Sequence, residues 1–427
     1  MAGNSENLKK TIPITRPFFG EEEVRAASEV IRSGWVTQGP KVKEFEDAFA
    51  SYVGSKHACA VSNCTTALHL ALLTVGVKPG DIVVTVSHSF IATANSARYC
   101  GGEPVFIDVE KDGLNMCPQA LKQFLSSECE KRPSGLFYKN VSKLIRSESP
   151  LSILVGDNKG KVENIGRIAA IVVVHQLGVP CNLKAILPIA HSYKIPVVED
   201  AAFGTGSKVS LDEGKTWEKI GKPHGDIACF SFHPRKPLVT GEGGMLTTSN
   251  EEHDALFRLL RHQGMAVSDL ARHQSKKIII EDYIVTGYNY RMTDIQAAIG
   301  IEQLKRLPEM IRRKEEAVQF YSENLSGISW LKIFKEPVCG RSNSHNYPVV
   351  IDKHAPMDRD SLMQHLLDRG ISTRPCVMNS HYEIPYRSDL WSLPNSENAR
   401  NNGLLLPIFY EITDDDLKKV VEEFKNV

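Results

Sequence analysis

The chain alternates short, continuous apolar runs with amphipathic stretches of helical length. Runs such as DIVVTVS, AAIVVVHQ and IPVVEDA are typical of strands that are buried on both faces of a sheet. Helix-like segments such as NLKAILPIAHSYK lie between these runs. Strands that alternate with helices of this length predict an α/β fold, with a mainly parallel sheet covered by helices on both faces.

The pattern changes in the last third of the chain. A long helical stretch begins at MTDIQAAIG, and we expect Pro308 to start a new helix within it. We predict a large α/β domain with an N-terminal helical segment at residues 1–265, a linking helical region at 266–328 and a small C-terminal α+β domain at 329–427. Residues 126–167 are charged, Ser-rich and weakly patterned, and we expect them to form a surface excursion.

Bulk composition limits the classes of function. Lys plus Arg and Asp plus Glu each number 51 in 427 residues, so the formal net charge is zero, and neither nucleic acid nor an anionic membrane is the expected partner. No apolar run is long enough to cross a bilayer, and the first residues do not resemble a secretion signal. The nine cysteines are scattered, which favours reduced thiols in a cytoplasmic protein over disulfides or a metal site.

One lysine and one acid carry the strongest chemical signal. Asp200 ends an apolar strand in IPVVEDAAFGTGS, and Lys236 follows in the Gly-rich passage CFSFHPRKPLVTGEGGML. This layout is expected of an enzyme that uses pyridoxal phosphate (PLP). The lysine would hold the cofactor aldehyde as a Schiff base, and the acid would keep the pyridine nitrogen protonated.

Other segments fit around this pair. Cys64 and Thr65 lie where a strand gives way to a helix, and the free N–H groups of a helix start can hold a phosphate. The Ser231 hydroxyl could reach the same phosphate, and the Phe90 ring could stack on a flat cofactor. Taken singly, each of these residues is better explained as a helix cap, a strand residue or a core ring.

Together these runs resemble the DegT/StrS family of PLP-dependent sugar aminotransferases. The resemblance spans nearly the whole chain and includes SGWVTQGPKVKEFEDAFASYVG, SNCTTALHLAL, SFIATAN, VHQLGVP, VEDAAFGTGS, SFHPRKPLVTGEGGM, GYNYRMTDIQAAIG and GLLLPIF. It implies the fold type I (aspartate aminotransferase-like) architecture and a role in sugar biosynthesis for polysaccharides or antibiotics.

The resemblance also implies roles for individual residues. Lys236 would bind the cofactor and then move protons, Asp200 would pair with the pyridine nitrogen, and Phe90 would stack on the ring. The phosphate would be held by Cys64, Thr65 and Ser231.

The family's working unit is a homodimer with shared active sites, in which Asn289 would reach the phosphate of the neighbouring subunit's cofactor. The implied substrates are glutamate or glutamine as amino donor and a nucleotide-linked keto sugar as acceptor. Trp35, Arg374 and His381 would contact substrate, although each is also explained as an ordinary core or surface residue. The sequence leaves open which sugar or cyclic ketone is aminated, and whether a sugar reacts at C3 or C4.

Two positions depart from the family pattern. Cys64 replaces the usual glycine of the phosphate turn. Phe203 replaces the Gln or His that normally lies near the cofactor ring hydroxyl, and a phenyl ring cannot donate a hydrogen bond. We hypothesise that His175, at the end of the preceding strand, supplies part of the missing polar contact.

Three other functions compete with transamination. A PLP-dependent sugar dehydratase ranks lower, because family members with that activity replace the lysine with histidine. A non-catalytic sensor that binds PLP or a sugar nucleotide is kept open by Phe203. A phosphate-binding α/β protein without PLP ranks lowest, because the chain has no Gly-Lys-Ser/Thr phosphate loop.

Overall fold

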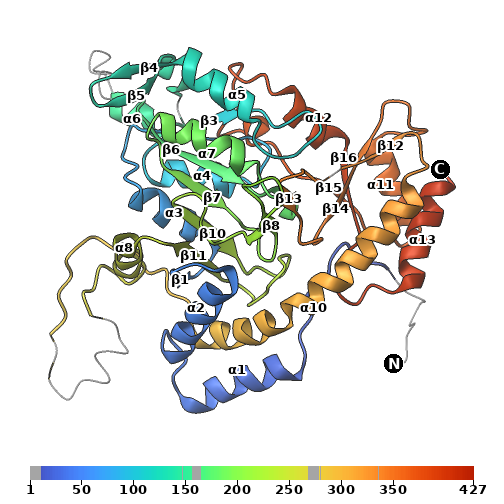
Figure 1. Cartoon of the computed structure of the whole chain (residues 1–427), viewed down its shortest axis with the longest axis horizontal. Coiled ribbons are helices and arrows are strands. Elements are labelled where there is room, and N and C mark those ends of the chain that lie inside the picture. Colours follow the sequence, from blue (N-terminus) through green and yellow to red (C-terminus); the bar gives the residue numbers. More distant parts are fainter. Residues whose placement is uncertain (1–10, 147, 156–164, 268–277, 279, 335) are drawn as a thin grey trace, which may run out of the picture.

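The computed structural model contains two main sheets, one of seven strands and one of four (Figure 1). The description covers residues 11–146, 148–155, 165–267, 278, 280–334 and 336–427. Among the helices in these ranges, none is long and apolar enough to cross a membrane.

The larger sheet has seven strands in the order β1-β11-β10-β7-β6-β2-β3. The five strands from β10 to β3 pair in parallel, and β11 is antiparallel to both of its neighbours. The predicted mainly parallel sheet is therefore confirmed. Its strands are β1 (His57–Val61), β2 (Ile82–Val86), β3 (Glu103–Ile107), β6 (Ile168–Val174), β7 (Val197–Asp200), β10 (Ile227–Ser231) and β11 (Gly244–Thr248).

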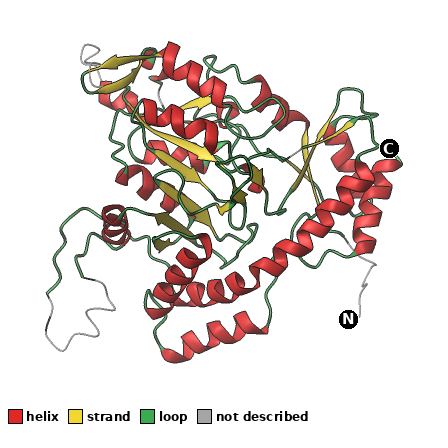
Figure 2. Cartoon of the chain, viewed as in Figure 1, coloured by secondary structure: helices red, strands yellow, loops and turns green. Residues whose placement is uncertain are grey.

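Both faces of this sheet are buried, because alternate side chains on each strand enter different cores. On β10, Ala228 and Phe230 pack in one core and Ile227 and Cys229 in the other. Figure 2 shows helices on both sides of the strands. The helices of the first core include α2 (Pro40–Val53), α5 (Pro118–Gln123) and α7 (Leu183–Ser192), and those of the second include α3 (Cys64–Thr74), α4 (Ala92–Tyr99) and α8 (Glu251–Arg261).

The smaller sheet is antiparallel and lies in the C-terminal part of the chain, in the order β12-β14-β16-β15. Its apolar face packs against nearby helices in a third core. The elements of this region are β12 (Leu331–Ile333), β14 (Tyr347–Ile351), α11 (Arg359–Asp368), β15 (Arg374–Pro375), α12 (Pro394–Asn402), β16 (Gly403–Leu406) and α13 (Asp414–Lys425).

One helix, α10 (Asp294–Leu325), contributes to both regions. Ala297 and Ile301 belong to the core of the larger sheet, whereas Tyr321 and Leu325 belong to that of the smaller one. The prediction that Pro308 starts a new helix was wrong, because α10 runs through it without interruption. Proline removes one backbone hydrogen bond, and burial of the flanking turns on both cores offsets that loss.

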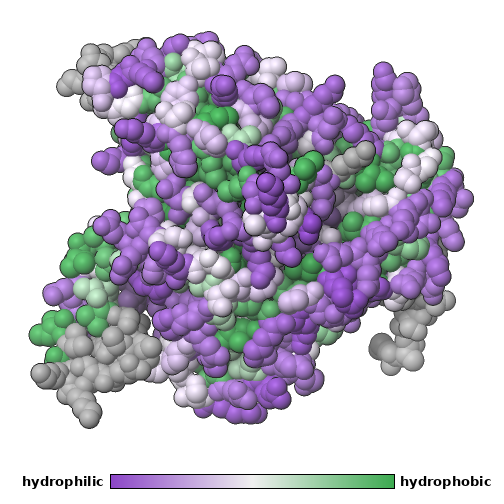
Figure 3. All heavy atoms as spheres, viewed as in Figure 1, coloured by the Kyte–Doolittle hydropathy of each residue, from purple (hydrophilic) through white to green (hydrophobic). Residues whose placement is uncertain are grey.

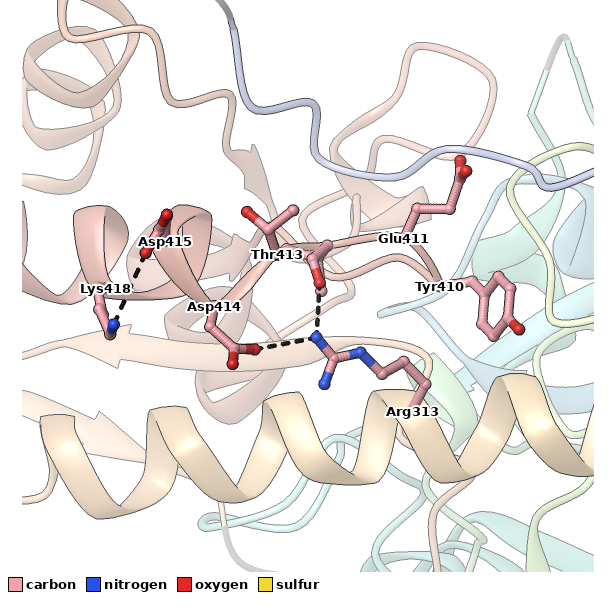
Figure 4. Close-up of a pocket in the computed structure, with 8 residues that line it drawn as sticks. Arg313, Tyr410, Glu411, Thr413, Asp414, Asp415 and Lys418 are labelled. Carbon is pink, nitrogen blue, oxygen red and sulfur yellow. Dashed lines mark hydrogen bonds and ion pairs between the residues drawn. The ribbon is translucent and has the colours of Figure 1, made fainter.

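Side chains at the start of α10 and in its second half bind it to its neighbours. The Asp294 carboxylate accepts hydrogen bonds from the N–H groups of Gly39, at 2.7 Å, and Val42, at 3.0 Å, and so caps α2. Arg313 donates to the Ile412 carbonyl, at 2.9 Å, and to Asp414, at 3.1 Å. Figure 4 shows Arg313 pointing from α10 toward Asp414 at the start of α13. The pocket drawn there is an open surface depression.

In the segment expected to be a surface excursion, the described residues 126–146, 148–155 and 165–167 contribute side chains to the core, and residues 147 and 156–164 lie outside the description. Leu136, Tyr138, Leu144 and Leu151 are buried in the core that α2 and α7 cover. The sequence pattern was weak because the elements are short: η1 (Phe124–Glu128), β4 (Cys129–Arg132), β5 (Gly135–Tyr138), η2 (Val141–Leu144) and α6 (Pro150–Val155).

The chain also has an N-terminal helix and a small three-stranded sheet. N-terminal α1 (Glu21–Ser33) packs against α10. A three-stranded sheet, in the order β13-β8-β9, connects the loop after Asp200 to the segment that leads into the smaller sheet. Its strands are β8 (Lys208–Val209), β9 (Glu218–Lys219) and β13 (Gly340–Arg341).

Candidate active site

Parallel pairing brings the predicted site residues to one edge of the larger sheet. Asp200 ends β7 and is in register with Val174 of β6 and with Cys229 of β10. The carboxyl ends of these strands therefore lie together, and ligands of open α/β sheets bind at that edge.

A cavity of about 870 Å³ opens at this edge. Most of the residues assigned from sequence to the cofactor line it, together with one of the three assigned to substrate. From that set the lining residues are Cys64, Thr65, Phe90, His175, Asp200, Phe203, Ser231, Lys236 and Arg374.

Asp200 is held as a buried carboxylate with one side toward the cavity. Its Oδ2 accepts from the Thr93 hydroxyl, at 2.7 Å, and its Oδ1 accepts from the Ala202 N–H, at 3.2 Å. Burial raises the pKa of Asp200, although these donors and the Lys236 charge oppose the rise. A cationic ring nitrogen in the cavity would supply the counter-charge that favours the ionised form.

The first turn of α3 provides backbone donors to the same cavity. Asn63 caps the helix by accepting from the N–H of Thr66, at 2.9 Å. In the described part of the chain, no acceptor lies within hydrogen-bond distance of the N–H groups of Cys64 and Thr65. Gly244 packs so closely on this turn that a Cβ there would lie 2.4 Å from the Asn63 carbonyl carbon. The glycine-rich run is thus needed for close packing against the helix start.

Lys236 is placed over an aromatic ring. Its Nζ lies 3.2 Å from the centre of the Phe203 ring, and burial lowers the pKa of this amine to about 8. The Cys64 thiol is close to both Lys236 and Asp200, and burial raises its pKa well above the usual value. The site therefore holds a lysine that is readily neutralised and a thiol that stays protonated.

The hypothesis for His175 was wrong. Its Nδ1 accepts from the Cys181 N–H, at 3.0 Å, so the proton is on Nε2, which donates to Glu199, at 3.0 Å. Both ring nitrogens are occupied, and neither remains for the polar contact expected with the cofactor ring. Burial opposes ionisation of Glu199, but the hydrogen bond from His175 and those from backbone N–H groups outweigh it and lower the Glu199 pKa.

Three other assigned residues do not line this cavity. His381 is buried away from it, and its Nδ1 lies 2.6 Å from the Ser87 hydroxyl, so its expected substrate contact is not supported. Trp35 lies near the start of α2 and donates to the Gln38 carbonyl, at 3.1 Å. Asn289 is exposed in the segment between α8 and α10.

Sequence reasoning missed most of the positive charge in the cavity. Arg235, Arg359 and Arg400 line it together with Arg374. Arg235 directly precedes Lys236, so its position in the motif was the available signal. Arg359 and Arg400 come from α11 and α12, and only the tertiary structure brings them to the strand ends.

Curated relatives match the chain over almost its full length. It is 32% identical over 424 residues to the uncharacterized protein MJ1066 of Methanocaldococcus jannaschii, covering 97% of each chain. It is also 32% identical over 422 residues to the spore coat polysaccharide biosynthesis protein SpsC of Bacillus subtilis, again covering 97% of each.

Solved structures have the same architecture. The aminotransferase TlmJ from Streptoalloteichus hindustanus is 31% identical, with a TM-score of 0.79 and coverage of 97% of this chain and 98% of that one. A sequence model of the DegT/DnrJ/EryC1/StrS aminotransferase family matches residues 17–130 and 159–425. The predicted family, the fold and the enzyme class, an aminotransferase, are confirmed. The chain belongs to the DegT/DnrJ/EryC1/StrS aminotransferase family.

Proposed function

We propose that the protein transfers an amino group from glutamate or glutamine to a nucleotide-linked keto sugar. The observation that carries the proposal is a single cavity that combines Lys236, Asp200 and four arginines. The chain is similar to SpsC, whose name places that protein in spore coat polysaccharide biosynthesis, and this similarity supports a sugar as the acceptor.

The residues of the cavity fit PLP. Asp200 would accept from the pyridine nitrogen, and the backbone N–H groups of Cys64 and Thr65 would donate to the phosphate, with Ser231 beside them. Phe90 is 61% exposed at the cavity and offers a ring face to stack on the cofactor. When bound, PLP supplies an electron sink for the charge left when a proton leaves the donor carbon.

Lys236 would hold the cofactor aldehyde and then act as the acid and base. With its pKa lowered to about 8, a useful fraction of the amine is neutral near physiological pH and can accept the α-proton of the donor. The ammonium that results lies against the face of Phe203, which stabilises a cation. The same group can then return the proton without moving far.

The arginines favour anionic substrates. In the described ranges, the guanidinium groups of Arg235 and Arg374 have no hydrogen-bond or ion-pair partner, although both line the cavity. Desolvation, followed by the nearby charge of Arg374, lowers the pKa of Arg235. Two guanidinium groups this close repel each other until an anion lies between them. A diphosphate or the carboxylates of the donor would neutralise both.

We propose a homodimer as the working unit. Trp35 and Asn289 do not line the cavity of their own chain, which supports their contributing to the site of a partner. The segment before α10 carries exposed apolar side chains, visible in green beside the grey spheres in Figure 3, that contact with a second subunit would bury. They include Ile278, Ile280, Ile284 and Val285.

The two half-reactions provide the test. Protein loaded with PLP is mixed with glutamate or glutamine, and the absorbance of the bound cofactor is followed; nucleotide keto sugars are then screened for its return. Loss of the absorbance with a donor and its return with an acceptor is the expected result. A response to neither substrate would instead support a non-catalytic sensor, and sugar dehydration without amino transfer would support the dehydratase.

A further inference from the structure

A lysine buried in α10 has no carboxylate partner among the described residues. The Lys314 side chain is 6% exposed, and it lies between Met310, which packs in the core of the larger sheet, and Ala317, which packs in that of the smaller one. Within the described ranges its hydrogen-bond partner is His345 Nδ1, at 2.9 Å, and no acidic side chain lies within ion-pair distance. An unpaired buried cation is unfavourable for stability, so this lysine calls for another explanation.

The partners of His345 fix which atom donates. His345 Nε2 lies 3.0 Å from the Arg235 carbonyl, which can only accept, so Nε2 carries the proton. His345 Nδ1 is then an acceptor, and Lys314 donates to it. Burial lowers the pKa of His345 well below its usual value, so the imidazole is neutral. Burial also lowers the pKa of Lys314 to about 8. A directed chain of hydrogen bonds therefore runs from Lys314 through His345 to the Arg235 carbonyl.

The end of this chain is the peptide that carries the active-site lysine. The Arg235 carbonyl belongs to the amide that joins Arg235 to Lys236, so a hydrogen bond there restrains the backbone beneath the Lys236 side chain. The imidazole also lies 6.0 Å from the Phe203 ring, centre to centre, and that ring supports the Lys236 amine.

A neighbouring residue fixes the Phe203 loop. Asn343 Nδ2 donates to the carbonyls of Phe203, at 2.6 Å, and Thr205, at 2.9 Å. Residues 343–345 thus hold both the peptide of the active-site lysine and the ring under its amine. They lead directly into β14, so these contacts connect the smaller sheet to the catalytic residue.

We propose that Lys314 and His345 are positioning residues that hold the backbone of Lys236 in place for cofactor capture and proton transfer. The proposal rests on the role of Lys236 in transamination and is independent of which acceptor is used. It gives a reason for a buried, unpaired lysine to be present, because a directed donor is needed at His345 Nδ1.

Lys314→Met is the decisive variant, with Lys305→Met as its matched control. Lys305 is on the same helix, and its side chain is 66% exposed. Because methionine removes a buried charge and keeps the apolar stem, the thermal midpoint of the Lys314→Met apoprotein should equal or exceed that of the wild type. Its capture of PLP and its kcat should nevertheless fall by about tenfold or more, with KM for the donor changed by less than about twofold. Lys305→Met should match the wild type in all three measurements.

Substitutions of His345 give a second, independent comparison. His345→Gln keeps an N–H donor that can reach the Arg235 carbonyl, whereas His345→Leu removes it, so Gln should recover a large part of the capture rate that Leu loses. Wild-type capture by Lys314→Met, or equal behaviour of the Gln and Leu variants, would overturn the proposal. If the wild-type protein itself captures no PLP, the proposed function fails, and that outcome is distinct from a failure of the positioning role alone.

Discussion

The Nζ of Lys236 lies 3.2 Å from the centre of the Phe203 ring. Family members usually carry Gln or His at this position. In this chain the position holds a phenyl ring whose face contacts the Lys236 amine. The contact favours the ammonium form, and burial opposes it.

Replacing Phe203 with leucine should lower the pKa of Lys236 further. Leucine keeps the apolar surroundings but loses the cation–π contact, which is worth about 0.5–2 kcal/mol, or about 0.4–1.5 pH units. The midpoint of PLP capture by the apoprotein should move to lower pH by an amount in this range. A midpoint that stays in place or rises would contradict the assigned contact.

Capture of PLP by the wild-type apoprotein should depend on pH through Lys236. The amine attacks only when neutral, so the rate should rise by about tenfold per pH unit below the pKa and level off above about 8. Stopped-flow absorbance between about pH 6 and pH 9.5 measures this profile. A midpoint near the ordinary lysine value of about 10.4 would show that the amine is not buried as described.

Lys236→Arg should abolish transfer while preserving the fold. The guanidinium keeps the positive charge but cannot lose its proton under these conditions, so it can neither capture the aldehyde nor accept the α-proton. We expect kcat to fall by at least about a thousandfold. The check is steady-state amino transfer, together with a circular dichroism spectrum like that of the wild type; residual activity within tenfold would contradict the assignment.

Arg374→Ala should weaken binding of an anionic substrate. Loss of one charge-assisted hydrogen bond costs about 1.5–3 kcal/mol, which corresponds to about ten- to a hundredfold in KM. Measuring the two half-reactions separately distinguishes a carboxylate contact in the donor from a phosphate contact in the acceptor. Arg369, whose Nε lies 2.8 Å from Glu423 on the surface, is the matched control, and Arg369→Ala should change neither KM.

Glu103→Ala should destabilise the fold. Glu103 is fully buried, and its carboxylate accepts from the Arg98 Nη2, at 2.7 Å, and from the Ser149 hydroxyl, at 2.8 Å. Its loss leaves Arg98 without its anion, and breaking a buried pair costs about 3–5 kcal/mol. Urea unfolding should register this loss, whereas the exposed control Glu309→Ala should cost less than about 1 kcal/mol. Similar midpoints for the two variants would contradict this description.

Ser149 belongs to the segment that the sequence analysis expected to be a surface excursion. Residues 131–158 lie outside the match to the family, and their polar composition suggested a surface excursion. In the structure Leu144 and Leu151 enter the core, and Arg146 donates to the Tyr386 carbonyl, at 2.9 Å. Short elements give too few turns or alternations for periodicity to distinguish a buried face from a solvated one.

The sequence by itself determined the parts of this protein that local pattern encodes. The apolar strands, the helix start at Cys64, the acid at the end of β7 and the lysine in its glycine-rich passage were all readable, because each depends on neighbours along the chain. The same local patterns placed Asp200 and Ser231 at the ends of strands, and the structure showed that these strands are adjacent.

Only the tertiary structure decided how distant residues act on that site. His175 was expected at the cofactor ring, but Cys181 and Glu199 occupy both of its nitrogens. No sequence pattern singled out Lys314 and His345, although their hydrogen bonds lead to the Arg235 carbonyl, in the peptide that joins Arg235 to Lys236. The physical reason is that the ionisation and hydrogen bonding of a buried polar group depend on which partners surround it in space, and sequence spacing does not record those partners.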